Sequence, residues 1–200
     1  MTMKRERMGE HIVKVEGRFD RHGRLLVYKL PAGDGGGSFE VAGINDRYHG
    51  AKARELRAMI QKGQHARAEK EVGHYIMAYT DGVKAWFPEG HKTKHPHVEL
   101  LLRDIFFNRG GRGAAATLQI ALGVHVDGNI GKVSKEAFAE ALNDSDSLAK
   151  RITAARATYE KRTYPWKKSA RNEKSKFWRG LSNRWANSHR AAMALKEDTV

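Results

Sequence analysis

The chain has 200 residues, enough for one domain with a buried core, and its formal net charge of +14 favours contact with polyanions such as nucleic acid, anionic lipid or acidic wall polymer. No apolar run approaches the roughly 20 residues that span a bilayer, and the charged N-terminus lacks the apolar core of a secretory signal. Without cysteine the chain forms no disulfide. We therefore predict that the protein is synthesised in the cytoplasm without a signal peptide. If it acts outside the cytoplasm, it must first be released or exported.

The N-terminal part is predicted to contain one helix and one hairpin. Apolar residues recur at helical spacing over residues 3–16, and Gly17 follows as a helix terminator. Glu16 therefore lies at the helix end, beside the apolar stripe. Residues 24–30 and 38–44 are predicted to be strands, because apolar and β-branched residues gather there on either side of a glycine-rich turn.

The rest of the chain is predicted to be helical, interrupted where glycine and proline gather. The predicted helices cover residues 50–62, 65–80, 97–108, 114–122, 134–142, 145–161 and 174–192. The helix 97–108 is apolar on nearly all sides, which indicates a central buried helix ended by the glycines of 109–113. Residues 82–97 are predicted to form a loop beside a cleft. The fold class is thus mainly α with a small N-terminal β-hairpin.

Carboxylates near the hairpin suggest acid–base chemistry on a glycosidic bond, which uses two carboxyl groups, one of them kept protonated by apolar neighbours. Glu16 is the candidate general acid. Asp34 in the turn could stabilise charge on the sugar or hold a water, Glu40 in the second strand could act as the base, and Asp20 could contact substrate or cap a turn. A solvated carboxylate is the alternative for each of them. The separation of the two carboxyl groups decides between inversion and retention.

Aromatic and histidine residues offer further candidates. Trp86, in a loop, is a candidate for stacking on a sugar ring. Tyr79 is a second candidate, but its helical spacing is also typical of a core residue. His91, His95 and His97 lack a fourth ligand and are interpreted as a solvated loop. We expect no metal and no cofactor.

Several motifs together resemble a known family. Glu16-Gly17, the glycine turn with Asp34, and the strand from Glu40 to Ile44 occupy the places of a Glu-Gly-Gly helix end, an Asp-containing turn and a Thr-x-x-Gly-Ile strand. The segments 104–110, 118–123, 126–131 and 177–184 are similar to the associated peptidoglycan-binding region. The chain thus resembles glycoside hydrolase family 108, the N-acetylmuramidases of phage endolysins and secretion-activating proteins. It departs from that family at Glu40, which replaces the threonine, and in the longer interval between Glu16 and Asp34.

The resemblance implies a lysozyme-like α+β fold with the hairpin beside an active-site cleft. It implies a catalytic part at 1–96, a helical peptidoglycan-binding part at 97–200, and hydrolysis of the β-1,4 bond between N-acetylmuramic acid and N-acetylglucosamine. Trp86, Tyr79, Asn108, Gln119 and Asp20 would then contact the glycan. The expected partners are peptidoglycan glycan strands, the anionic envelope surface, and a holin or secretion machinery that gives access to the periplasm or cell wall.

Two alternatives from other classes stay open. A module that binds cell wall without cutting it would explain why Glu40 replaces the family's threonine. A nucleic-acid-binding protein would explain the basic C-terminal stretch, in which lysine and arginine alternate with Tyr164, Trp166 and Trp178.

Overall fold

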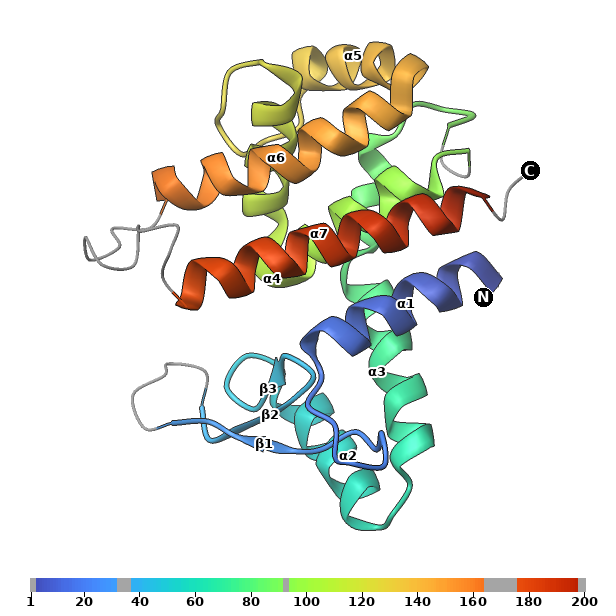
Figure 1. The fold of residues 1–200 in the computed structure, drawn as a ribbon, viewed down its shortest axis with the longest axis vertical. Helices are drawn as coiled ribbons and strands as arrows, with labels where there is room; N and C mark the ends of the chain where they lie inside the picture. The colour runs from blue at the N-terminus through green and yellow to red at the C-terminus, as the bar shows by residue number, and fades with distance from the viewer. Residues whose placement is uncertain (1–2, 32–36, 92–93, 164–175, 198–200) are drawn as a thin grey trace. The chain divides into compact units, whose positions relative to one another are not determined.

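The computed structural model describes residues 3–31, 37–91, 94–163 and 176–197 (Figure 1). The chain divides into two compact units, Met1–Ala78 and Tyr79–Val200. The sequence analysis placed the division after residue 96. The 3-10 helix η1 (Asp81–Trp86) packs on α4 (Pro96–Leu122) and belongs to the second compact unit, while the predicted division by role stays a prediction.

The first unit contains three helices and a small sheet. Its helices are α1 (Met3–Glu16), α2 (Gly50–Gln61) and α3 (His65–Tyr79). Its antiparallel sheet has the order β1 (Tyr28–Lys29), β2 (Phe39–Val41), β3 (Ile44–Asn45). The predicted hairpin is therefore present within a three-stranded sheet.

The predicted strand 38–44 was too long, because a tight turn divides it into β2 and β3. Ala42 and Gly43 both have positive φ, 47° and 76°. Two consecutive residues with positive φ give the primed turn that suits the twist of a two-residue hairpin. Val41 pairs directly with Ile44 across this turn.

The core of the first unit lies between one face of the sheet and the helices. Phe39, Val41 and Ile44 are buried, and β2 and β3 both pack on α2. Helix α1 approaches α3 at two glycines: a Cβ added to Gly9 would lie 3.1 Å from the carbonyl oxygen of Gly73. Any larger side chain at Gly9 would therefore push α1 away from α3.

The second unit is helical throughout its described elements. After η1 and α4 come α5 (Lys132–Ala141), η2 (Leu142–Asp144), α6 (Ser145–Thr163) and α7 (Lys176–Glu197). Helix α4 packs against α5, α6 and α7, and its first half is buried on nearly all sides, which confirms the prediction of a central helix. The predicted break at 109–113 is a kink instead: Gly110 takes φ 70° and ψ 173°, and the helix then resumes at once.

The fold class is mainly α with a small antiparallel sheet, as the sequence predicted. Within the described ranges, no helix combines the length and the apolar character needed to cross a bilayer.

Candidate active site

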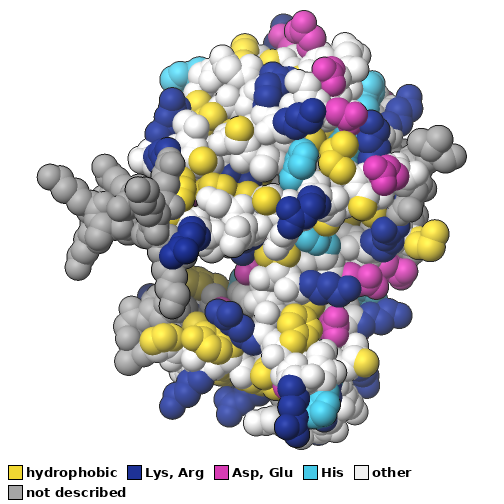
Figure 2. Space-filling view, viewed as in Figure 1, with side chains coloured by type: hydrophobic (Ala, Val, Ile, Leu, Met, Phe, Trp, Pro, Cys, Tyr) yellow, Lys and Arg dark blue, Asp and Glu magenta, His cyan; other side chains and the backbone are white. Residues whose placement is uncertain are grey.

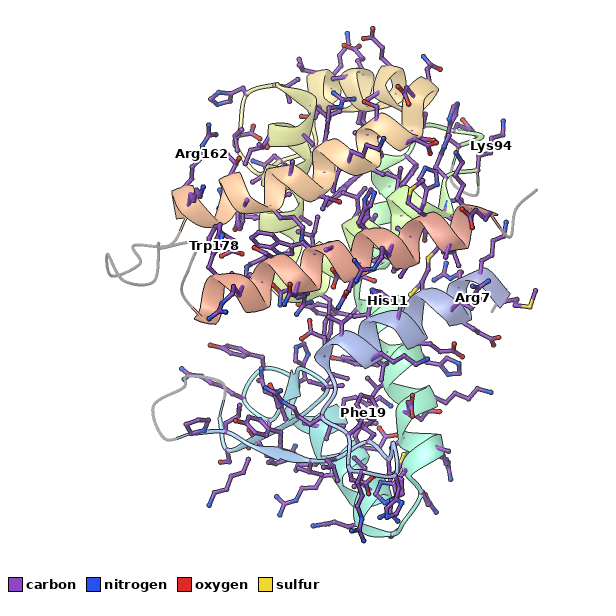
Figure 3. All side chains as sticks on the ribbon, viewed as in Figure 1. Arg7, His11, Phe19, Lys94, Arg162 and Trp178 are labelled. Carbon is purple, nitrogen blue, oxygen red and sulfur yellow. The ribbon has the colours of Figure 1, made fainter. Side chains whose placement is uncertain are left out.

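Glu16 is the last residue of α1, and local packing fixes its place. Ile12 and Val13 of the preceding turn are fully buried, while Glu16 itself is half-buried. The helix stops because Gly17 turns the chain: a Cβ there would lie 2.6 Å from the Phe19 ring and 2.7 Å from the Val13 carbonyl oxygen (Figure 3). Only glycine allows this close return, so the turn holds the Glu16 carboxyl at the helix end.

The segment after Gly17 runs back along the chain toward β1. Phe19 forms an isolated antiparallel β-bridge with Leu25, and the Leu26 amide donates to the Arg18 carbonyl oxygen at 2.8 Å. The Arg18 guanidinium lies 5.1 Å from the centre of the Tyr28 ring. The helix end is thus joined directly to the edge of the sheet.

Glu40 occupies the outer face of the central strand. Its neighbours Phe39 and Val41 are buried, so the alternation of a strand turns the half-buried Glu40 away from the core. Tyr28 and Asn45 are its direct partners on the flanking strands and therefore share its face. Asp34 lies outside the described residues, in the segment between β1 and β2.

The carboxylate of Asp20 caps a turn. Its carboxylate accepts hydrogen bonds from the Arg24 amide at 2.9 Å, from the Arg24 guanidinium at 2.7 Å and from the His22 amide at 2.8 Å. These bonds, the Arg24 amide first, lower the pKa of Asp20 to about 2. The turn-capping alternative therefore describes what Asp20 does in this structure, and its predicted contact with glycan stays a prediction.

Asp46 is a residue that the sequence analysis missed. Its Oδ1 accepts the amides of Ser38 at 2.7 Å and Phe39 at 3.2 Å, and so holds the start of β2. Burial raises the pKa of Asp46, but these amide hydrogen bonds outweigh that effect and leave it below its ordinary value. A Cβ at Gly37 would lie within 3 Å of this carboxylate. Two features of the sequence could have identified Asp46: a glycine directly before a strand and an aspartate directly after its hairpin.

The second unit gathers four aromatic side chains, two of which were predicted to contact substrate. Tyr79 meets Phe106 and Phe107 edge-on, with ring centres 5.9 and 6.2 Å apart. Trp86 lies 6.3 Å from Phe106. Tyr79 keeps 43% of its surface exposed, so it is not a core residue, and Trp86 is half-buried. Both side chains are therefore at least partly accessible to solvent.

Gln119 anchors a loop instead of facing a ligand. It is 1% exposed, and its amide nitrogen donates to Asp127 Oδ1, the Asn129 carbonyl oxygen and Ser134 Oγ at 2.7 to 3.1 Å. Its oxygen accepts the amides of Asp127 and Gly128. Both polar atoms of its side chain therefore form hydrogen bonds within the chain, and its predicted contact with glycan stays a prediction. Asn108 is half-buried on α4, and its carbonyl oxygen accepts a hydrogen bond from Arg109.

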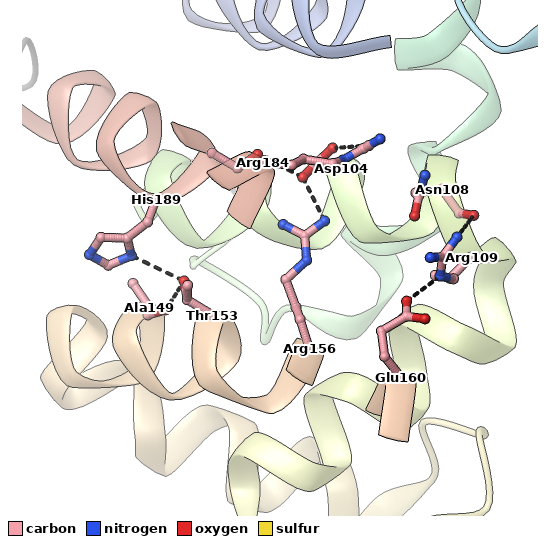
Figure 4. Close-up of polar contacts among 10 residues, drawn as sticks. Asp104, Asn108, Arg109, Ala149, Thr153, Arg156, Glu160, Arg184 and His189 are labelled. Carbon is pink, nitrogen blue, oxygen red and sulfur yellow. Dashed lines mark hydrogen bonds and ion pairs between the residues drawn. The ribbon is translucent and has the colours of Figure 1, made fainter. Parts of the chain in front are cut away.

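Buried ion pairs join α4 to α6 and α7. Asp104 is fully buried and accepts from Arg156 at 2.7 Å, Arg184 at 2.8 Å and Ser188 at 2.9 Å (Figure 4). Burial raises the pKa of Asp104, but the two guanidinium groups outweigh it and hold the pKa well below its usual range. Asp104 is therefore ionised at neutral pH and does not act there as an acid or a base. Its role is to hold α6 and α7 against α4, and we call this set of contacts the Asp104 clamp.

The histidines of the segment before α4 differ from the prediction of a solvated loop. His97 is 1% exposed and lies in the first turn of α4, whereas His91 and His95 stack with ring centres 5.4 Å apart and are half-buried. Burial lowers the pKa of His97 to about 4 despite Asp146 at 3.7 Å. Across the described ranges, no group of three acidic or histidine side chains is arranged to hold a metal ion.

The first unit has a pocket that is separate from Glu16. It measures about 450 Å³ and lies between α1 and α3, lined by Glu6, Glu10, Lys14, Ala66, Glu69, Lys70, Gly73 and His74. Its α1 residues follow one another at intervals of four along one helix face. Glu16 comes two residues after Lys14, which is roughly 200° further around the helix. The pocket is therefore not the setting of the candidate acid.

Comparison with known proteins finds a likeness of fold. No protein-family model and no curated protein matches the sequence. Among solved structures, the chain is similar to SagA from Brucella abortus, with a TM-score of 0.55 over 94% of this chain and 93% of that chain. Sequence identity over this match is 19%, so the likeness concerns the fold.

Proposed function

We propose that this protein is a peptidoglycan hydrolase of the lysozyme type, an N-acetylmuramidase. It cleaves the β-1,4 bond between N-acetylmuramic acid and N-acetylglucosamine, and Glu16 is the general acid. The observation that carries the proposal is the half-buried Glu16 at the end of α1, joined within a few residues to a sheet whose outer face presents Glu40. The likeness of fold to SagA and the resemblance to family 108 support the same conclusion.

The proposed reaction begins with proton transfer from Glu16 to the oxygen of the leaving sugar. Positive charge then develops on the other sugar, where a second carboxylate stabilises it. Asp34 is the leading candidate for this second group and Glu40 follows. A carboxylate that activates water inverts the anomeric centre, whereas one that attacks the sugar directly retains it.

The remaining residues have supporting roles in this proposal. The exposed ring of Tyr79 and the half-buried Trp86 stack on sugar rings, and the helical part from 97 to 200 holds the glycan strand. The net charge of +14 favours the acidic envelope. In this proposal, a holin or an export machinery gives the protein access to the cell wall.

Release of dye-labelled fragments from purified peptidoglycan tests the proposal. Glu16→Gln keeps the shape of the side chain and removes the acid, so we expect the rate to fall by roughly 100-fold or more. Glu10→Gln is the matched control, since Glu10 is an exposed glutamate of the same helix on the face of the α1–α3 pocket. Full activity of Glu16→Gln would remove Glu16 from its role.

One alternative has an observation of its own. Glu40 replaces the threonine of the resembled family, which favours a module that binds peptidoglycan without cutting it. In that case the wild-type protein would sediment with insoluble peptidoglycan and release no fragments in the same assay.

A further inference from the structure

The outer face of the sheet carries two pairs of arginine and tyrosine around Glu40. At one edge, the Arg18 guanidinium lies 5.1 Å from the centre of the Tyr28 ring. Beside the other edge, the Arg47 guanidinium lies 5.5 Å from the centre of the Tyr48 ring. Tyr28 is 37% exposed and Tyr48 is 68% exposed, and both arginines are exposed.

Backbone contacts hold both pairs at this face. The Leu26 amide donates to the Arg18 carbonyl oxygen, which holds the Arg18 backbone beside the segment that leads into β1. Tyr28 pairs with Glu40, and Glu40 pairs with Asn45, so the three side chains form a row across the sheet. The Asn45 side chain accepts the Tyr48 amide at 2.9 Å and thereby places Tyr48 next to the end of that row. In Figure 2, hydrophobic side chains with Lys and Arg beside them show on the surface over the sheet.

This combination suits a ligand that carries an apolar ring face and a carboxylate within one sugar unit. A tyrosine ring packs against the C–H face of a sugar, while a guanidinium forms two parallel hydrogen bonds to a carboxylate. Stacking on the ring keeps the guanidinium in place, so little side-chain entropy is lost on binding. The row itself contains one negative charge, on Glu40, and the two flanking arginines Arg18 and Arg47 outnumber it.

We propose that this face binds the free lactyl carboxylate of N-acetylmuramic acid, and that the protein therefore prefers glycan strands without stem peptides. The identity of the glycan rests on the proposed function. The lactyl carboxylate is the one carboxylate attached to the sugar itself, and it is free only after hydrolysis of the amide that joins it to the peptide. An amidase-class reaction, which returns that amide to a carboxylate and an amine, must therefore supply the preferred substrate.

Calorimetric titration of the full chain tests the preference. The chain carries Glu16→Gln to prevent cleavage, and the ligands are chitotetraose and tetrasaccharides of alternating N-acetylglucosamine and N-acetylmuramic acid, with and without stem peptides. We expect the peptide-free acidic tetrasaccharide to bind roughly tenfold more tightly than chitotetraose, the effect of one charge-assisted hydrogen bond. Arg18→Gln should remove this difference, and Tyr28→Ala should weaken both ligands.

Arg21→Gln is the control, because it removes the same charge from an exposed arginine of the nearby turn, whose guanidinium donates to the His22 ring. It should leave the preference intact. Equal affinity for the neutral and the peptide-free acidic glycan, or tighter binding of the peptide-bearing one, would overturn the inference. An equal loss in Arg21→Gln and Arg18→Gln would also overturn it. Hydrolysis by the wild type is measured separately, so either proposal can fail while the other stands.

Discussion

Asp104 links three helices of the second unit. It is a single buried carboxylate between the guanidinium groups of Arg156 and Arg184. Breaking such a pair from one side leaves the other charges buried without compensation, a loss of about 3–5 kcal/mol. We therefore expect Asp104→Asn to lower the free energy of unfolding by about that amount in a denaturant titration.

The control for Asp104 is an exposed pair of the same chemical type. Glu136 lies 4.0 Å from Lys132 on α5, and both side chains are mostly exposed. Pairs of this kind contribute about 0–1 kcal/mol. Glu136→Gln should therefore change little, and a loss from Glu136→Gln equal to that from Asp104→Asn would refute the account of the clamp.

His97 should make stability depend on pH. Burial lowers its pKa to about 4, with Asp146 opposing and with His95 and Lys196 adding to the shift. Between pH 6.5 and about 4 the unfolded chain binds a proton at this position and the folded chain does not, so stability falls as pH falls through that window. The shift corresponds to at most about 3 kcal/mol.

Urea titrations from pH 7 to pH 4 measure this effect. His97→Leu has no proton to bind at this position, so its stability should fall less steeply than that of the wild type over the same range. Parallel pH profiles for the two proteins would show that His97 does not titrate differently in the folded and unfolded chains.

Sequence patterns predict single residues well where the cause is local. The place of Glu16 at a helix end follows from Gly17 next to it, and the structure confirms that place. The partners of Asp104 could not be predicted in this way, because Arg156 and Arg184 are 52 and 80 residues away in the chain. The hydrogen bonds of Gln119 to Asp127 and Asn129 could not be predicted either, because they depend on how the loop folds back on α4.

At the scale of elements, the kink in α4 depends on one glycine. Gly110 adopts φ 70° and ψ 173°, a region that is essentially restricted to glycine. We expect Gly110→Ala to destabilise the protein by about 1–3 kcal/mol, measured as the shift in chemical unfolding.

A second glycine on a helix provides the comparison. Gly180 lies in α7 with open space around it, so alanine adds no clash there and favours the helix by up to about 1 kcal/mol. Gly180→Ala should therefore be neutral or stabilising. If Gly110→Ala behaved in the same way, the kink would not require glycine.

Periodicity predicts long helices better than it predicts short strands. The apolar run of 97–108 correctly indicated the central helix, since burial on all sides follows directly from composition. The division between β2 and β3 rests on the backbone angles of Ala42 and Gly43, which alternation of apolar residues does not reveal. The glycines at 109–113 indicated that the helix would end there. In the structure, α4 instead bends at Gly110 and continues.

At the scale of the whole molecule, the two units contribute different parts of the proposed function. The first unit holds Glu16 and the sheet with Glu40, whereas the second unit holds the aromatic side chains Tyr79 and Trp86. The sequence analysis placed Tyr79 and Trp86 in the predicted catalytic part at 1–96, together with Glu16 and Glu40. A boundary between compact units after Ala78 was not predicted. It depends on the packing of η1 on α4, which residue composition does not reveal.

The measurement that tests the central claim most directly is mass spectrometry of the fragments released from purified peptidoglycan. The account predicts that wild-type protein leaves new reducing ends on N-acetylmuramic acid, and that Glu16→Gln leaves none above background. New reducing ends on N-acetylglucosamine, or the same fragments from both proteins, would contradict it.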